Sequence, residues 1–247
     1  MTVTAIPGYL VHLVNCHRNS QTVTVIPTVV SPVGNGDDYK IGKPFHTKGG
    51  RTFLVGGAGN DREGLYLPLL KETFERHGIA GVEITDSSIS LGWQLDAATV
   101  LMTNNLRRPQ DYARYTGKIG IDIPKDGQLN FVGYSNGAVL VAQTALAFAY
   151  SGYKVDNVVL LGAPVNNDLL KGLALHPNVG QVTVLNLSEF GDPIRAGMSD
   201  TQILKAVPTL NSQMGSHTGH FVYSQPGPLG DLRRNYLGAL LYRNGVR

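Results

Sequence analysis

The five residues Gly133-Tyr134-Ser135-Asn136-Gly137 have the types and spacing of a turn that presents a nucleophile. They lie between a short apolar run, 129–132, and a long one, 138–150. The first run predicts a buried strand and the second a buried helix, so the chain must reverse within very few residues. Such a turn strains its middle residue and crowds the positions two before and two after it, where glycine removes the colliding Cβ atoms. We therefore expect Ser135 to stand exposed at the tip of a nucleophile elbow.

A serine hydroxyl becomes a nucleophile when a base accepts its proton and an acid orients that base. Two of the seven histidines, His217 and His220, come just before the last predicted helix. His220, which follows a glycine, is the preferred base, and His217 is the alternative. Asp192 follows the end of a predicted strand and is the preferred acid, with Glu189 as the alternative. The chain order serine, aspartate, histidine supports this choice.

A glycine-rich turn, 56–61, follows the short apolar strand 52–55 and precedes a predicted helix, 63–77. The spacing G-x-G-x-x-G is absent, and no Lys followed by Ser or Thr comes after it, which argues against a dinucleotide or P-loop site. Glycines let the backbone approach a ligand closely, so the N–H groups of this turn can stabilise an anion.

Short apolar strands alternate with helices, which predicts βαβ units and a mostly parallel sheet covered on both faces. The expected strands are 52–55, 81–85, 129–132, 157–161, 181–187 and a last short one at 220–223; the expected helices are 63–77, 138–150, 229–242 and a helical stretch within 93–116. Residues 195–219 show no strong period. Tyr9–Asn15 and Thr22–Val30 predict a hairpin at a sheet edge. Ligands of such sheets bind beyond the carboxyl ends of the strands, where Gly57-Ala58, Ser135, Asp192 and His220 are expected.

With these residues identified, the chain resembles the α/β-hydrolase superfamily, most of all its lipase and esterase members. The matching pieces span about residues 50–245: the strand and glycine turn 53–59, the elbow 133–137, Leu161-Gly162-Ala163-Pro164, Gly191-Asp192-Pro193-Ile194 and Gly219-His220. The resemblance implies one domain, 1–247, with a hairpin and connection over 1–50 and a catalytic core over 51–247. It implies an eight-stranded, mostly parallel sheet whose first two strands are the hairpin. It also implies an oxyanion hole formed by the backbone N–H groups of Asn136 and Ala58, with Gly57 as the alternative to Ala58.

Two features depart from the superfamily pattern. Gly56 and Gly57 stand where many lipases have a histidine, and only about sixteen residues separate Pro164 from Gln181, where the superfamily often inserts a cap. We therefore expect a minimal cap or none, with any lid coming from 86–127 or 195–219. A fairly open pocket that admits a bulky or lipid-like acyl chain follows from this.

The expected activity is hydrolysis of small-molecule or lipid carboxylic esters by Ser135, His220 and Asp192 through an acyl-enzyme intermediate, without a cofactor or metal. A phospholipid ester, a thioester or an amide is the alternative substrate for the same triad. A hydrolase of this kind could act as an exported antibacterial effector. A binding scaffold without catalysis is the remaining alternative.

Composition agrees with a globular chain: 42% of the 247 residues are hydrophobic, 16% are charged and the net charge is +3. Arg107-Arg108 and Arg233-Arg234 lack interleaved aromatics, so no nucleic-acid surface is expected. A single cysteine, Cys16, excludes an intrachain disulfide. Neither a signal sequence nor an apolar run of membrane-spanning length is found, so the expectation is a cytoplasmic protein without a transmembrane segment. Signal-independent export and transient contact with a membrane surface stay as alternatives.

Overall fold

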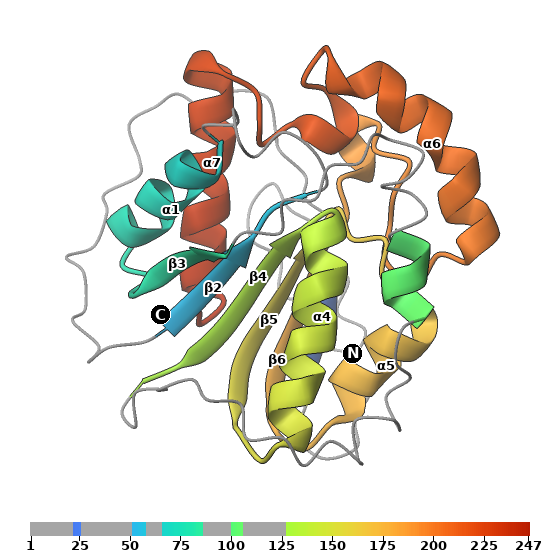
Figure 1. Ribbon diagram of the computed structural model, residues 1–247. Helices are drawn as coiled ribbons and strands as arrows, with labels where there is room; N and C mark the ends of the chain where they lie inside the picture. The colour runs from blue at the N-terminus through green and yellow to red at the C-terminus, as the bar shows by residue number, and fades with distance from the viewer. Residues whose placement is uncertain (1–21, 26–50, 58–65, 86–99, 106–126) are drawn as a thin grey trace.

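The described residues form an α/β fold around one parallel sheet (Figure 1). The computed structural model describes residues 22–25, 51–57, 66–85, 100–105 and 127–247. The strands run in the order β1-β6-β5-β4-β2-β3, and every pairing is parallel. They are β1 (Thr22–Val25), β2 (Arg51–Val55), β3 (Val82–Thr85), β4 (Leu129–Tyr134), β5 (Val155–Leu161) and β6 (Val179–Leu185).

Helices cover both faces of this sheet. On one face, α1 (Tyr66–Arg76) and α7 (Gly227–Arg243) enclose an apolar core with the strands. On the other, α4 (Asn136–Tyr150), α5 (Asn167–Leu175) and α6 (Asp200–Met214) enclose a second core. Two short 3-10 helices, η1 (Ser188–Phe190) and η2 (Gly219–Phe221), lie in the connections around α6, and residues 100–105 are also helical. In Figure 1, α6 lies beyond the carboxyl ends of the strands.

The central strand and helix follow directly from the apolar runs on either side of the elbow. Every residue of β4 is buried, as expected for a strand covered on both faces. Eleven of the fifteen residues of α4 are buried, which is why its sequence is apolar nearly all round. Burying each large apolar side chain stabilises the fold by about 1.5–3 kcal/mol. The burial of β4 and α4 therefore holds Ser135, which lies between them, in a fixed position.

The predicted parallel sheet, covered on both faces, is confirmed for the described residues. The expected eight strands are not: the described residues contribute six. Thr22–Val25, within the predicted strand 22–30, forms the edge strand β1 and pairs in parallel with β6. Its predicted hairpin partner, Tyr9–Asn15, lies outside the described residues.

The structure between residues 195 and 223 differs from the interpretation of the sequence. The segment 195–219, which shows no strong period, holds α6. This helix begins with a capping box: Ser199 accepts a hydrogen bond from the backbone of Gln202, whose side chain accepts one from the backbone N–H of Ser199. Pro208 lies inside this helix. Because proline removes one backbone donor and has a low helix propensity, the sequence does not indicate a helix here. The strand expected at 220–223 is replaced by η2 and a turn.

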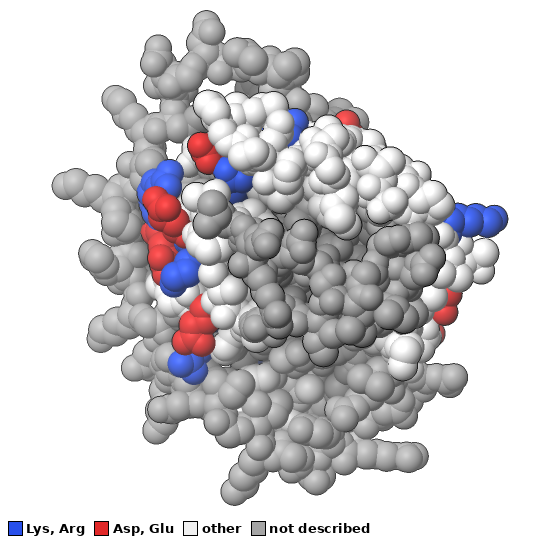
Figure 2. Space-filling view, turned by 45° about the horizontal axis from the view of Figure 1, so that its top comes forward, with Lys and Arg blue, Asp and Glu red and all other residues white. Residues whose placement is uncertain are grey.

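Charged side chains on the described surface are of both signs. On the face shown in Figure 2, acidic and basic side chains intermingle along the side where α1 lies. Two ion pairs along α1, Lys71–Glu75 and Glu72–Arg76, account for part of this mixture. Within the part of the chain that the structure describes, no helix has both the length and the apolar character needed to cross a bilayer.

Candidate active site

Ser135 occupies the strained turn between β4 and α4. Its backbone has φ 56° and ψ −125°, a combination that non-glycine residues adopt only when their surroundings enforce it. A Cβ atom at Gly133 would lie 2.6 Å from the carbonyl oxygen of Gly137, and one at Gly137 would collide with the carbonyl of Gly56. The first of these near-contacts is the crowding predicted from the sequence, and the second shows that Gly137 also lets α4 approach the end of β2.

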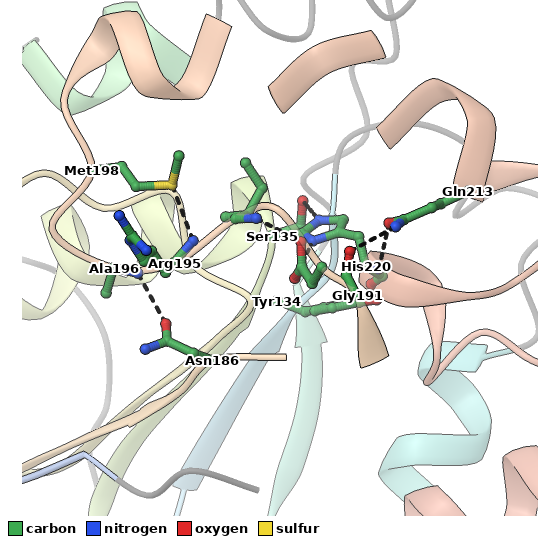
Figure 3. A network of polar contacts seen from close by, with 11 residues as sticks. Tyr134, Ser135, Asn186, Gly191, Arg195, Ala196, Met198, Gln213 and His220 are labelled. Atoms are coloured by element: carbon green, nitrogen blue, oxygen red, sulfur yellow. Dashed lines mark hydrogen bonds and ion pairs between the residues drawn. The ribbon is translucent and has the colours of Figure 1, made fainter. Parts of the chain in front are cut away.

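A continuous chain of hydrogen bonds joins Ser135 to His220, which lie together in Figure 3, and His220 to Asp192. The Ser135 Oγ and His220 Nε2 atoms are 2.7 Å apart, and His220 Nδ1 is 2.8 Å from Asp192 Oδ2. A carboxylate accepts, so Nδ1 carries the proton and Nε2 can accept from the serine hydroxyl. Ser135 is half-buried, whereas His220 and Asp192 are only 2% and 5% exposed. The nucleophile therefore reaches the surface while its two partners lie in a low-dielectric setting.

Asp192 is held by the turn that contains it. Its second carboxylate oxygen, Oδ1, accepts a hydrogen bond of 2.8 Å from the backbone N–H of Ile194. Gly162, at the end of β5, packs against it: a Cβ there would lie 3.1 Å from Asp192 Oδ2. The sequence-based expectation that Asp192 directly follows a strand needs correction, because β6 ends at Leu185 and η1 intervenes.

His220 is fixed through its backbone as well as its ring. Its N–H donates to Gln213 Oε1 at 2.9 Å, and its carbonyl accepts from the Tyr134 hydroxyl. The rings of Tyr134 and His220 stack, with centroids 5.6 Å apart and planes inclined by 23°. The residue before the nucleophile thus positions the histidine.

The alternative base and acid lie elsewhere. His217 Nδ1 contacts Ser224 Oγ at 3.0 Å, and because Ser224 donates its own proton to the Phe221 carbonyl, His217 is the donor in that pair. Glu189 is exposed within η1. Of the four candidates, His220 and Asp192 are the two that the structure brings to Ser135.

The expected oxyanion donors are described in part. Asn136 is the first residue of α4, where a backbone N–H has no acceptor within the helix, and no acceptor for it is found among the described residues. Gly57 lies beside the nucleophile, since a Cβ on it would be 3.0 Å from Ser135 Cβ, and its N–H donates to the Tyr66 hydroxyl at 3.1 Å. Ala58 lies outside the described residues. The Asn136 side-chain oxygen is buried without a hydrogen-bond partner in the described part of the chain.

A second, buried tyrosine packs against Tyr134. The ring of Tyr223 meets that of Tyr134 edge-on, with centroids 6.0 Å apart. Burial, with a smaller contribution from the charge of Glu189, raises the pKa of the Tyr223 phenol well above its usual value. Tyr223 therefore packs behind Tyr134 as a neutral side chain and is not an acid or base near pH 7. Among the described residues, no group of three His, Cys, Asp or Glu side chains is placed to hold a metal ion.

Sequence reasoning missed Tyr134 and Gln213, which hold the histidine backbone. Tyr134 lies inside the elbow motif, but its hydroxyl contacts a residue 86 positions later in the chain. Gln213 belongs to α6, the helix that the sequence did not reveal. Only tertiary structure brings the two side chains to the backbone of His220.

No protein-family model matches the chain, and no curated protein sequence is significantly similar to it. The site itself is therefore the basis for inferring function. It combines a strained, half-buried serine, a hydrogen-bonded histidine and a buried carboxylate, which is the set of groups used for nucleophilic catalysis.

Proposed function

We propose that the protein is a serine hydrolase of the α/β-hydrolase type that cleaves carboxylic esters. The observation that carries this proposal is the unbroken hydrogen-bond chain from Ser135 Oγ through His220 to Asp192, with distances of 2.7 and 2.8 Å. The order of the three residues along the chain and their place beyond the carboxyl ends of parallel strands support it. The strained backbone of Ser135 supports it further, because such strain clusters at active sites.

The geometry suggests the usual two-step reaction. Ser135 Oγ attacks the ester carbonyl while its proton passes to His220 Nε2, and Asp192 stabilises the imidazolium that results. The imidazolium then protonates the leaving alcohol, which leaves an acyl group on Ser135. A water molecule attacks the acyl group, gives its proton to His220 and releases the carboxylic acid. As the acid leaves, His220 passes the proton that it took from water to the Ser135 oxygen, so atoms and charges balance over the cycle.

Two backbone donors would stabilise the negative oxygen of each tetrahedral intermediate. The Asn136 N–H at the start of α4 is the first, since both its position after the nucleophile and the helix dipole favour an anion there. The second would be Ala58, with Gly57 as the alternative. Gly57 would first have to exchange its hydrogen bond to Tyr66, which makes Ala58 the better choice.

The surface around His220 favours an uncharged substrate. Residues 206–230, which include the second half of α6, η2 and the start of α7, contain no Asp, Glu, Lys or Arg. Met214 and Leu229 within this stretch are 39% and 49% exposed. In Figure 2, most of the described surface away from the α1 side is likewise uncharged. A neutral ester with an apolar acyl chain suits these surroundings better than an ionic substrate does.

Labelling with a fluorophosphonate probe, followed by peptide mapping, tests the proposal. We expect the label on Ser135 and no label on the Ser135→Ala variant. The control is Ser212→Ala, which should be labelled normally. This substitution removes an exposed hydroxyl that, in the described structure, bonds only to the carbonyl of Thr209. Hydrolysis that persists in Ser135→Ala would refute the mechanism. Absence of both labelling and hydrolysis would favour the binding scaffold.

A substrate panel distinguishes the variants of the proposal. Chromogenic esters of graded chain length, a phospholipid, a thioester and an anilide would be compared by kcat/KM. Carboxylic esters are expected to give the highest value. A higher value for the phospholipid, thioester or anilide would keep the triad and replace the substrate class.

A further inference from the structure

One side chain of α6 bridges the two loops that carry the acid and the base. Gln213 Nε2 donates a hydrogen bond of 2.8 Å to the carbonyl of Gly191, the residue before Asp192. Gln213 Oε1 accepts one of 2.9 Å from the backbone N–H of His220. Figure 3 shows both bonds converging on this single amide. The planar amide of Gln213 thus links the loop that carries Asp192 to the loop that carries His220.

The orientation of this amide follows from its neighbours. One neighbour is a carbonyl, which can only accept, and the other is a backbone N–H, which can only donate. Turning the amide of Gln213 by half a turn would set oxygen against oxygen and N–H against N–H. The bridge therefore requires both a donor and an acceptor on the same side chain.

The loop before His220 is shaped around the glutamine. Gly219 has φ +54°, and a Cβ atom on it would overlap with the Gln213 amide. The helix that carries Gln213 is anchored in turn, because Ile203, Ala206 and Val207 of α6 are buried. His220 is consequently clamped at both of its backbone polar groups, by Gln213 at the N–H and by Tyr134 at the carbonyl.

We propose that Gln213 is a positioning residue for the Ser135–His220–Asp192 chain. Among the described residues its amide hydrogen-bonds to the backbones of Gly191 and His220 and to none of the three reacting side chains. The inference rests on the proposed function, since it assigns a role in the same site. A displacement of about 1 Å in a catalytic group can cost about 100-fold in rate. Loss of the bridge should therefore reduce kcat about 10- to 100-fold while KM stays nearly unchanged.

The test compares Gln213→Leu with Asn211→Leu, a matched change of an exposed amide on the same helix. Gln213→Leu should show the loss in kcat, and Asn211→Leu should behave as the unaltered protein. Gln213→Glu is the conservative variant: its carboxylate still accepts from His220 but cannot donate to Gly191, so an intermediate loss is expected. Far-UV circular dichroism and urea unfolding establish that each variant is folded. A folded Gln213→Leu with unchanged kcat would overturn the inference, whatever its stability.

A second readout needs no substrate. The proton between His220 Nδ1 and Asp192 Oδ2 should give a strongly downfield ¹H NMR signal, assigned by its loss in Asp192→Asn. We expect Gln213→Leu to shift or broaden this signal and Asn211→Leu to leave it in place. If the unaltered protein fails to hydrolyse any ester, the proposed function fails, but the NMR signal still tests whether Gln213 positions His220. A shift or broadening in Gln213→Leu supports the positioning role, and an unmoved signal refutes it.

Discussion

The two ends of the same strands bury polar side chains in different ways. At the amino end, Thr52, Asn130 and Asn157 face one another across three neighbouring strands, in the register of the sheet. Asn157 donates to Asn130 at 2.7 Å, and Asn130 donates to the Thr52 hydroxyl at 3.1 Å. At the carboxyl end, the polar groups are Ser135, His220 and Asp192.

The backbones at the two ends differ as much as the side chains do. The amino-end residues have ordinary strand geometry and bond to one another, so each bond adds about 0.5–1.5 kcal/mol of net stability. At the carboxyl end, Ser135 is held at φ 56°, which costs about 1–3 kcal/mol, and the side-chain oxygen of Asn136 is buried without a partner in the described residues. One end adds hydrogen bonds that stabilise the sheet, whereas the other keeps a strained backbone and a buried oxygen without a partner in the described residues, as expected if the proposed active site lies there.

The largest contrast is expected from Ser135→Gly. Glycine tolerates the positive φ, so the free energy of unfolding should stay level or rise by up to about 2 kcal/mol. Activity should fall by about 10⁶-fold in kcat, because the nucleophile is gone. Urea unfolding and ester hydrolysis measure the two effects. A clear loss of stability would mean that Ser135 is not strained, and would remove one half of the contrast between the ends.

Asp192→Asn should cost about 10⁴-fold in kcat with little change in fold. Asp192 Oδ1 accepts from the Ile194 N–H, and the amide oxygen of asparagine will keep that bond. The amide nitrogen then faces His220 Nδ1, which favours the wrong tautomer of the ring. The matched comparison is Glu189→Gln in the exposed η1, for which hydrolysis should be unaffected. Equal losses in the two variants would show that the acid was assigned wrongly.

The elbow and the strands around it could be predicted because their signals are local. Glycine at 133 is required by contacts within the elbow and the start of α4, and the continuous apolar runs of β4 and α4 reflect burial on all sides. Asp192 and His220 were chosen from the order serine, aspartate, histidine along the chain. That order depends on the succession of the strands and not on the lengths of the connections between them.

The rest depended on contacts that sequence patterns do not record. Helix α6 was missed because Pro208 interrupts its backbone hydrogen bonds while burial of Ile203 and Ala206 still holds it in place. Consequently the contact between Gln213 and His220 was out of reach, although the two are seven residues apart. The parallel pairing of β1 with β6 joins segments more than 150 residues apart and leaves no local trace.

At the amino end, Asn130→Val should reverse the pattern seen with Ser135. The substitution removes the hydrogen bonds that Asn130 makes with Thr52 and Asn157, at a cost of about 1–3 kcal/mol in the free energy of unfolding. Hydrolysis should be unchanged while the protein is folded, because the site lies at the opposite end of the strand. The double variant Asn130→Val/Asn157→Val should lose less than the sum of the single losses, since both halves of one bond are removed together. Strict additivity would mean that the two amides do not depend on each other.

The smallest effect is expected from His176, which precedes β6 at the same end of the sheet. Its Nδ1 accepts a hydrogen bond of 3.1 Å from the Asn178 N–H, and its ring meets Tyr150 edge-on with centroids 4.3 Å apart. Burial lowers the pKa of His176 below its ordinary value of 6.5. The unfolded chain then binds the proton more readily than the folded one, so this residue's contribution to stability is complete above about pH 6.5 and declines as the pH falls below it.

Urea unfolding above and below pH 6.5 tests this for the unaltered protein and for His176→Gln, which lacks the titrating ring. The unaltered protein should lose more stability on acidification than the variant does, by less than the cost of Asn130→Val. Unfolding and not hydrolysis is the quantity to follow, because His176 lies at the end of the sheet opposite to Ser135. An equally steep loss in both proteins would mean that His176 is protonated as easily in the folded state as in the unfolded one. Any loss of stability on acidification would then come from other groups. The contrast between the two ends of the sheet would depend on the stability measurements at Asn130 and Asn157 alone.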